Sequence, residues 1–105
     1  MIKITLYSLG DLITGFEISG HSTQNADDFD GKLVCSAVSS ATIMAANTIT
    51  EIIGDESDVE CYDGYLKLIC SKADCCQSVL EGLKLHLEQL HLQYQDRISL
   101  TLNRL

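Results

Sequence analysis

The stretch "MIKITLYSLGDLITGFEIS", residues 1–19, contains two runs of alternating apolar and polar side chains. The tetrapeptide at residues 8–11, Ser-Leu-Gly-Asp, separates the two runs and is typical of a turn. Alternation with a period of two is typical of a β-strand that buries one face. The stretch therefore predicts a β-hairpin at the start of the chain. The side chains expected on its alternating faces are Ile2, Ile4 and Leu6 in the first strand, and Leu12, Thr14, Phe16 and Ile18 in the second.

Beyond this hairpin, the sequence predicts two helices, a second hairpin and a last strand. Residues 35–53 are apolar or small almost all round, so we expect a largely buried helix with Gly54 as its C-terminal cap. Residues 57–71 predict a hairpin around the turn Asp63-Gly64. Residues 71–74 form a capping box for a second helix, and residues 97–105 alternate again as a strand. The core stripe of the second helix comprises Cys76, Val79, Leu80, Leu83, Leu87, Leu90 and Tyr94.

The predicted order of elements is β-β-α-β-β-α-β. Hairpins that alternate with helices favour an α+β fold, here a mostly antiparallel sheet with two helices packed on one face. A chain of 105 residues has room for one hydrophobic core, so residues 1–105 should form a single domain.

The charge balance limits the classes of partner. The formal net charge of −8 argues against direct binding of nucleic acid, because lysine and arginine are needed to displace counterions from phosphates. Such a charge suits a basic protein partner, and it equally suits plain solubility. The acidic residues after the first helix could form a solvated rim or receive a basic peptide. They are Asp55, Glu56, Asp58, Glu60 and Asp63.

The sequence also predicts a compartment. No basic segment followed by an apolar one comes after Met1, as a signal peptide would require. The longest mostly apolar run, residues 41–53, is too short to span a membrane. The five cysteines form neither a Cys-x-x-Cys pair nor a cysteine–histidine spacing typical of zinc, so we expect no disulfide framework and no metal. These features predict a cytoplasmic protein without a membrane partner.

His21 and Cys35 are the residues with the clearest chemical potential. His21 follows the end of a predicted strand, Cys35 starts the predicted first helix, and a polar loop, residues 22–32, lies between them. A helix N-terminus stabilises a thiolate, and a nearby imidazole can exchange its proton. The pair could therefore be a catalytic dyad, or Cys35 could be a small apolar filler. A metal site made by His21 with Asp27, Asp28 or Asp30 is a further alternative, although such a set has no fixed geometry.

The other thiols and imidazoles have simpler interpretations. Cys61 and Cys70 fall on the apolar faces of paired strands, so we expect structural roles for both. Cys75 flanks the second helix near its start, and we expect no particular role for it. His86 and His91 are expected on the surface of that helix. Leu85 and Leu92 lie off its core stripe, either as scattered surface leucines or as part of a subunit contact.

Three short motifs resemble a known family: Gly20-His21, then Leu33-Val34-Cys35, then Ala37-Val38-Ser39. The sequence is similar to the ribosomal-processing cysteine proteases called Prp. The resemblance implies that Cys35 is the nucleophile, His21 the general base, and Gly20 and Ser39 supporting residues. The sequence departs from the family pattern at Lys32, where aspartate is frequent, at Ser36, where alanine is common, and in a somewhat longer loop.

The same resemblance implies a substrate and an assembly. Family members are homodimers that need no cofactor and remove an N-terminal extension from the large-subunit ribosomal protein numbered twenty-seven. We therefore expect a cytoplasmic cysteine endopeptidase that acts on a basic ribosomal protein precursor. The alternative from a different class is a non-catalytic dimeric module that binds a basic ribosomal protein or an assembly factor.

Overall fold

The computed structural model describes residues 1–23 and 25–105. Its strands are β1 (Ile2–Leu9), β2 (Leu12–Ser19), β3 (Asp58–Tyr62), β4 (Tyr65–Ile69) and β5 (Ile98–Arg104). Its two long helices are α1 (Phe29–Asn47) and α2 (Gln77–Gln93). A π-helical stretch, η1 (Thr48–Ile53), continues α1, and a short 3-10 turn, η2 (Ala73–Cys75), precedes α2.

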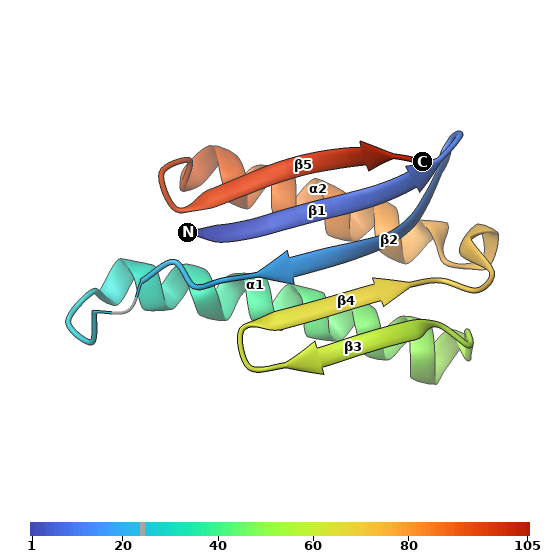
Figure 1. Ribbon diagram of the computed structural model, residues 1–105, viewed down its shortest axis with the longest axis horizontal. Coiled ribbons are helices and arrows are strands. Elements are labelled where there is room, and N and C mark those ends of the chain that lie inside the picture. The colour runs from blue at the N-terminus through green and yellow to red at the C-terminus, as the bar shows by residue number, and fades with distance from the viewer. Residues whose placement is uncertain (24) are drawn as a thin grey trace.

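The five strands form one sheet in the order β3-β4-β2-β1-β5. Three neighbouring pairs are antiparallel, and β5 runs parallel to β1 at one edge. Both helices lie behind the sheet in Figure 1, on the same face. The predicted α+β fold, its order of elements and its one-sided helical layer are therefore confirmed.

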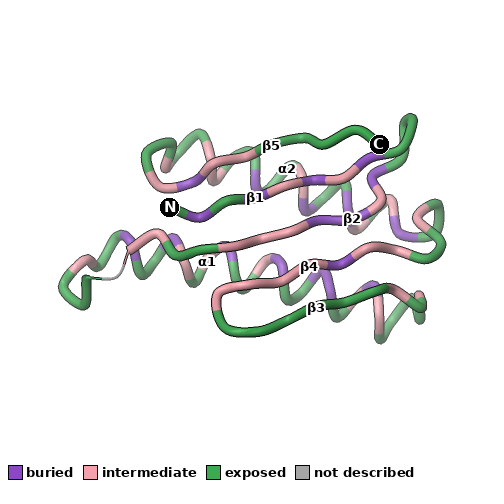
Figure 2. The backbone as a smooth tube through the Cα atoms, in the orientation of Figure 1, coloured by how far each residue is buried: buried purple, intermediate pink, exposed green. Residues whose placement is uncertain are grey.

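The core lies between the sheet and the two helices. Ile4 and Phe16 are fully buried on the sheet side, Val34 lies opposite them on α1, and Leu80 and Leu87 on α2. Figure 2 shows buried stretches on the central strands and at intervals along both helices. The predicted stripe of the second helix is confirmed, because every member is buried or packs against the core.

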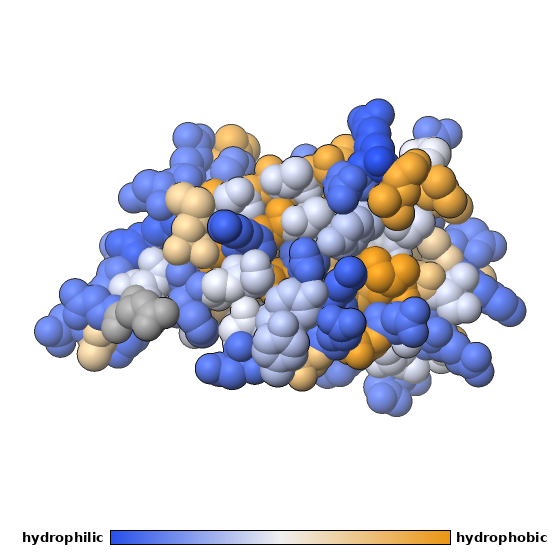
Figure 3. Space-filling view, viewed as in Figure 1, coloured by the Kyte–Doolittle hydropathy of each residue, from blue (hydrophilic) through white to orange (hydrophobic). Residues whose placement is uncertain are grey.

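The sheet face that no helix covers is a patchwork of hydrophilic and hydrophobic residues (Figure 3). Its centre holds a polar network in which the Glu17 carboxylate accepts hydrogen bonds from the Tyr7 hydroxyl at 3.2 Å and the Tyr65 hydroxyl at 2.5 Å. The hydrogen bond to Glu17 is the main cause that raises the pKa of Tyr65. Glu17 thus joins the central strands of the sheet to β4 on this open face.

The first helix begins earlier than the sequence indicated. It starts at Phe29 instead of Cys35, so four of the residues expected in the loop are helical. Asp28 explains the difference, because its side chain caps the helix by accepting a hydrogen bond from the Gly31 amide at 3.1 Å. Cys35 consequently lies in the second turn of α1, and the prediction that it starts the helix is wrong.

The first helix is also less buried than expected. A face of α1 and η1 is exposed, with Ile43 at 52%, Met44 at 66% and Ile52 at 80% of full exposure. A single helical layer on one side of a sheet leaves the outer side of each helix in solvent, which local composition does not reveal. The prediction for the end of this helix is confirmed, because Gly54 caps it with a left-handed φ of 79°.

The continuous helix Phe29–Ile53 spans 25 residues. By length and composition alone it is sufficient to cross a membrane, so the expectation of too short a run is wrong. Nevertheless, Val34, Val38 and Ile49 on this helix are buried in the core against the sheet. That packing is typical of the core helix of a globular domain.

The predicted capping box of the second helix is wrong as well. The α2 helix begins at Gln77, and the N-cap residue before it, Cys76, makes no side-chain capping bond. The Asp55 carboxylate binds the preceding turn instead, by accepting hydrogen bonds at 2.8 Å from the amides of Ser71 and Lys72. Asp55 therefore has a structural role, and it does not simply belong to a solvated acidic rim.

Candidate active site

Gly20 places His21 at the end of β2. Gly20 has a φ of 86°, and a β-carbon at this position would lie 2.6 Å from the carbonyl oxygen of Met1. Its amide donates a hydrogen bond to the Gly64 carbonyl at 3.0 Å. Only glycine combines this backbone conformation with so close an approach, which accounts physically for a glycine before the histidine.

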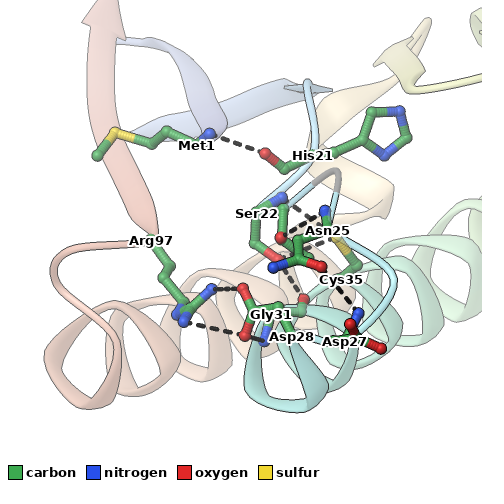
Figure 4. A network of polar contacts seen from close by, with 10 residues as sticks. Met1, His21, Ser22, Asn25, Asp27, Asp28, Gly31, Cys35 and Arg97 are labelled. Carbon is green, nitrogen blue, oxygen red and sulfur yellow. Dashed lines mark hydrogen bonds and ion pairs between the residues drawn. The ribbon is translucent and has the colours of Figure 1, made fainter.

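His21 is exposed, and its backbone is fixed more firmly than its ring. The Met1 amino group donates a hydrogen bond to the His21 carbonyl at 2.7 Å. The imidazole lies against the turn between β3 and β4, where a β-carbon on Gly64 would be 2.9 Å from Nε2. In Figure 4 the ring points away from Cys35.

The Cys35 thiol is half-buried and is held by Ser22. The Ser22 amide donates a hydrogen bond to Sγ at 3.2 Å, and the Ser22 hydroxyl oxygen lies 3.1 Å from the same sulfur. The Ser22 hydroxyl also donates to the carbonyl of Gly31. Cys35 lies six residues after Phe29, so it is beyond the first four residues of the helix, whose amides have no partner within the helix itself.

His21 and Cys35 face a common cleft of about 220 Å³ between α1, the end of β2 and the β3–β4 hairpin. Gly20 and Ser39 line the same cleft, so all four residues singled out from the sequence surround one space. The contacts of the described residues include no hydrogen bond between His21 and Cys35. The two side chains therefore line one cleft, with the imidazole turned away from the sulfur. Apolar side chains supply much of the remaining wall, among them Ile2, Ile18, Val38, Ile43 and Leu66.

The structure adds residues at or beside the cleft that the sequence did not single out. Ser22 contacts the sulfur directly, although its only signal was its place next to His21. Tyr62 and Tyr65 also line the cleft, with their rings stacked at 4.7 Å between centroids. The sequence feature that could have indicated them is the pair of tyrosines on either side of the Asp63-Gly64 turn. Cys61 lines the cleft too and is exposed, so its expected core position is wrong, because the edge strand β3 is exposed along its whole length.

The loop ahead of α1 is anchored at Asp28. Asp28 forms an ion pair with Arg97, with Oδ2 and Nη1 2.6 Å apart. The hydrogen bond from Arg97 is the main cause that lowers the pKa of Asp28 to about 2, and the Gly31 amide adds to it. Asp28 is therefore committed to the fold, which removes it from the alternative metal site with His21.

Among the described residues, one group of ligand atoms is close enough for a metal ion: Asp55, Cys70 and Cys76. Burial raises the pKa of the Cys70 thiol to about 12 and also raises that of Cys76. Metal binding needs thiolates, and the Asp55 carboxylate already accepts hydrogen bonds from two amides. We interpret this group as packing around the turn before α2.

The remaining predicted surface residues keep modest roles. His86, Leu85 and Leu92 are exposed on α2. His91 is partly buried, and its Nδ1 lies 2.9 Å from the Ile98 carbonyl oxygen, so it joins α2 to β5. None of these residues is among the described residues that line the cleft beside Cys35.

Comparisons with known proteins place this arrangement in context. The sequence profile of the family described as Cysteine protease Prp matches residues 1–99. No curated protein sequence matches the chain. The crystal structure of SMU.848 from Streptococcus mutans is similar with a TM-score of 0.85 and 18% identity, over 100% of this chain and 96% of that chain.

Two further similar structures come from S. aureus. Both are of an essential ribosomal processing protease Prp, one with a covalently linked product peptide and one with a substrate peptide. The first has a TM-score of 0.84 and 20% identity, and the second 0.83 and 18%. Each match covers 98% of this chain and 100% of the other. At these identities the structures establish the shared fold.

Proposed function

Because the chain belongs to the Prp cysteine protease family and is a cysteine protease, we propose that Cys35 is its nucleophile and His21 its general base. The observation that carries this proposal is the common cleft, which both side chains line. Gly20 sets the position of His21, and Ser39, one helical turn after Cys35, lines the same cleft as a supporting residue.

The chemistry proceeds in two steps. His21 takes the proton of the Cys35 thiol, and the sulfur attacks the carbonyl carbon of the scissile peptide. The carbon–nitrogen bond breaks as His21 returns its proton to the leaving amine, and water then hydrolyses the thioester. The imidazole must turn from Gly64 toward the sulfur before the first step. Catalytic contacts commonly tighten only when substrate binds, so the outward ring is compatible with this mechanism.

The proposed substrate is the N-terminal extension of the large-subunit ribosomal protein numbered twenty-seven. The S. aureus relatives are described as ribosomal processing proteases and bind peptides in their crystals. A net charge of −8 suits a basic ribosomal protein by long-range attraction. The chemistry needs no cofactor, and such a substrate places the enzyme in the cytoplasm.

We further propose that the protein is a homodimer. The structure offers two exposed apolar surfaces for the contact: Ile43, Met44 and Ile52 on the first helix, and Leu85 and Leu92 on α2. Light scattering of wild type, Met44→Asp and Leu85→Asp distinguishes them, because a charge within the contact lowers the measured mass toward one chain. A monomeric wild type would contradict the homodimer.

Cleavage of a matched peptide tests the enzymatic proposal. The purified protein is incubated with a peptide spanning the N-terminus of the ribosomal protein from the same genome, and products are read by mass spectrometry. We expect one cut by wild type and by Cys75→Ala, which removes an exposed thiol outside the described cleft lining. We expect none by Cys35→Ala or His21→Ala. Cutting by Cys35→Ala would exclude Cys35 as the nucleophile, and binding without cutting by wild type would favour a binding module.

A further inference from the structure

Ser22 contacts the proposed nucleophile by two separate groups. It follows His21 in the chain and lies beside Cys35 in Figure 4. Its amide is 3.2 Å and its hydroxyl oxygen 3.1 Å from Sγ. The side chain is partly buried, and the hydroxyl also donates to the Gly31 carbonyl, which fixes its orientation.

The position of the single hydroxyl hydrogen determines what Ser22 offers to sulfur. While that hydrogen points to the Gly31 carbonyl, a lone pair of Oγ faces Sγ and accepts the S–H of a neutral thiol. When the thiol loses its proton, the hydroxyl can turn its hydrogen to the sulfur. The thiolate then has two donors, the N–H and the O–H of Ser22. Hydrogen bonds to a charged acceptor are stronger than neutral ones, so this arrangement favours the thiolate.

Two amides at the start of α1 are engaged away from the sulfur. The Gly31 amide donates to the Asp28 side chain at 3.1 Å, and the Lys32 amide donates to the Asp28 carbonyl at 3.1 Å. Amides of this kind are the usual source of thiolate stabilisation at a helix N-terminus, and these two do not donate to Cys35. The amide and hydroxyl of Ser22 are instead the groups that can donate to the Cys35 sulfur in the second turn.

We propose that Ser22 is a positioning residue for Cys35, whose hydroxyl accepts the S–H of the resting thiol and donates to the thiolate once it forms. The proton that leaves sulfur goes to His21 in the enzyme, or to buffer in the absence of substrate. The inference rests on the proposed function only in taking Cys35 as the nucleophile.

The pH dependence of Cys35 alkylation tests this role without any peptide substrate. In the reaction the thiolate forms a bond to the methylene carbon of iodoacetamide, and iodide leaves. Peptide mapping by mass spectrometry gives the rate at Cys35 separately from the other thiols. For Ser22→Ala we expect the midpoint of the rate profile to rise by about one pH unit. A shift of this size corresponds to the loss of about one hydrogen bond to a charged group. Ser22→Thr keeps a hydroxyl and should restore the wild-type midpoint.

Controls separate this effect from a general disturbance. Ser36→Ala makes the same chemical change at an exposed position next to Cys35 and should leave the midpoint at the wild-type value. Ser22→Gly removes the hydroxyl by a second route, and it decides the result if Ser22→Ala melts at a lower temperature. An unchanged midpoint in the folded variant, or equal shifts in Ser22→Ala and Ser22→Thr, would overturn the role of Ser22.

Peptide cleavage by the same proteins distinguishes failure of this inference from failure of the proposed function. A wild type that cuts the peptide, with an unchanged alkylation midpoint in Ser22→Ala, overturns the role of Ser22 alone. A shifted midpoint with no cutting by wild type supports the Ser22 contact and contradicts the proposed substrate.

Discussion

The Asp28 carboxylate and the Arg97 guanidinium form a two-pronged ion pair, with Oδ2–Nη1 at 2.6 Å and Oδ1–Nη2 at 3.2 Å. The pair connects the N-terminal end of α1 to the start of β5. The Arg97 carbonyl in turn accepts a hydrogen bond from the Ile2 amide at 2.9 Å. The helix that carries Cys35 is therefore anchored to two strands at its N-terminal end.

We expect Arg97→Ala to loosen the first turn of α1 without unfolding the domain. The planar guanidinium matches the carboxylate at two points, which a lysine ammonium does not reproduce, so Arg97→Lys should restore only part of the effect. Hydrogen exchange measured by mass spectrometry should show faster exchange at residues 29–32 and little change in α2. Arg104→Ala, at the exposed end of β5, is the control. Equal protection of residues 29–32 in wild type and Arg97→Ala would contradict the anchoring role.

The ion pair also predicts how stability depends on pH. Arg97 and the Gly31 amide lower the pKa of Asp28 from 3.8 to about 2 in the folded state. A carboxyl whose folded-state pKa is lowered contributes stability above its unfolded value, and this contribution is lost as the pH falls toward 2. Urea unfolding at several values between about pH 2 and pH 6 should show wild type more stable than Asp28→Asn at the upper end, with the difference shrinking below pH 3.8.

Asp28→Asn is a matched variant, because asparagine still caps a helix but carries no charge. A difference in free energy of unfolding that stays constant over the whole pH range would contradict a stabilising role for the ion pair between Asp28 and Arg97.

The sequence contained most of the fold because the deciding signals were local. The alternation of Ile2, Ile4 and Leu6 predicted its strand, and the Asp63-Gly64 turn marked the second hairpin. The start of α1 was missed because Asp28 acts through its side chain, whereas residues 29–32 lack the apolar periodicity of a helix. The parallel pairing of β5 with β1 joins distant parts of the chain, so no local pattern indicates it.

The site could be predicted only in part, for a similar reason. The spacing of Gly20-His21 and Cys35 identified residues that do line one cleft. The contacts of Ser22 with Cys35 and Gly31 arise from tertiary folding of the loop onto α1. They depend on distances that neither residue type nor spacing specifies. The orientation of the His21 ring toward Gly64 also depends on tertiary packing, so the sequence pattern could not predict it.

The two helical glycines should respond in opposite directions to alanine. A β-carbon on Gly31 would lie against the Thr23 methyl and 2.7 Å from Nη1 of Arg97. A β-carbon on Gly82 in α2 would meet nothing within 4 Å. Gly82→Ala should therefore raise the free energy of unfolding by about 0.5–1 kcal/mol, as expected from helix propensity. Gly31→Ala should lower it by about 1–3 kcal/mol through overpacking. Urea titrations of both variants measure the difference, and equal stabilisation by both would show that the loop yields freely at Gly31.

The buried thiols should be much less reactive than the exposed ones. Burial raises the pKa of Cys70 to about 12, and burial also raises the pKa of Cys76, which is fully covered. Only the thiolate reacts with iodoacetamide, so at pH 8 Cys70 should label on the order of a thousandfold more slowly than an ordinary thiol with a pKa near 8.5. Cys61 and Cys75 are exposed and should label first among the four thiols other than Cys35.

Labelling in urea is the control for this order, because unfolding removes the burial and should bring all five cysteines to similar rates. Peptide mapping at successive times gives each rate from a single sample. Rapid labelling of Cys70 in the folded protein would mean that the turn between β4 and α2 opens readily. In that case the Asp55 hydrogen bonds to Ser71 and Lys72 would not hold it closed.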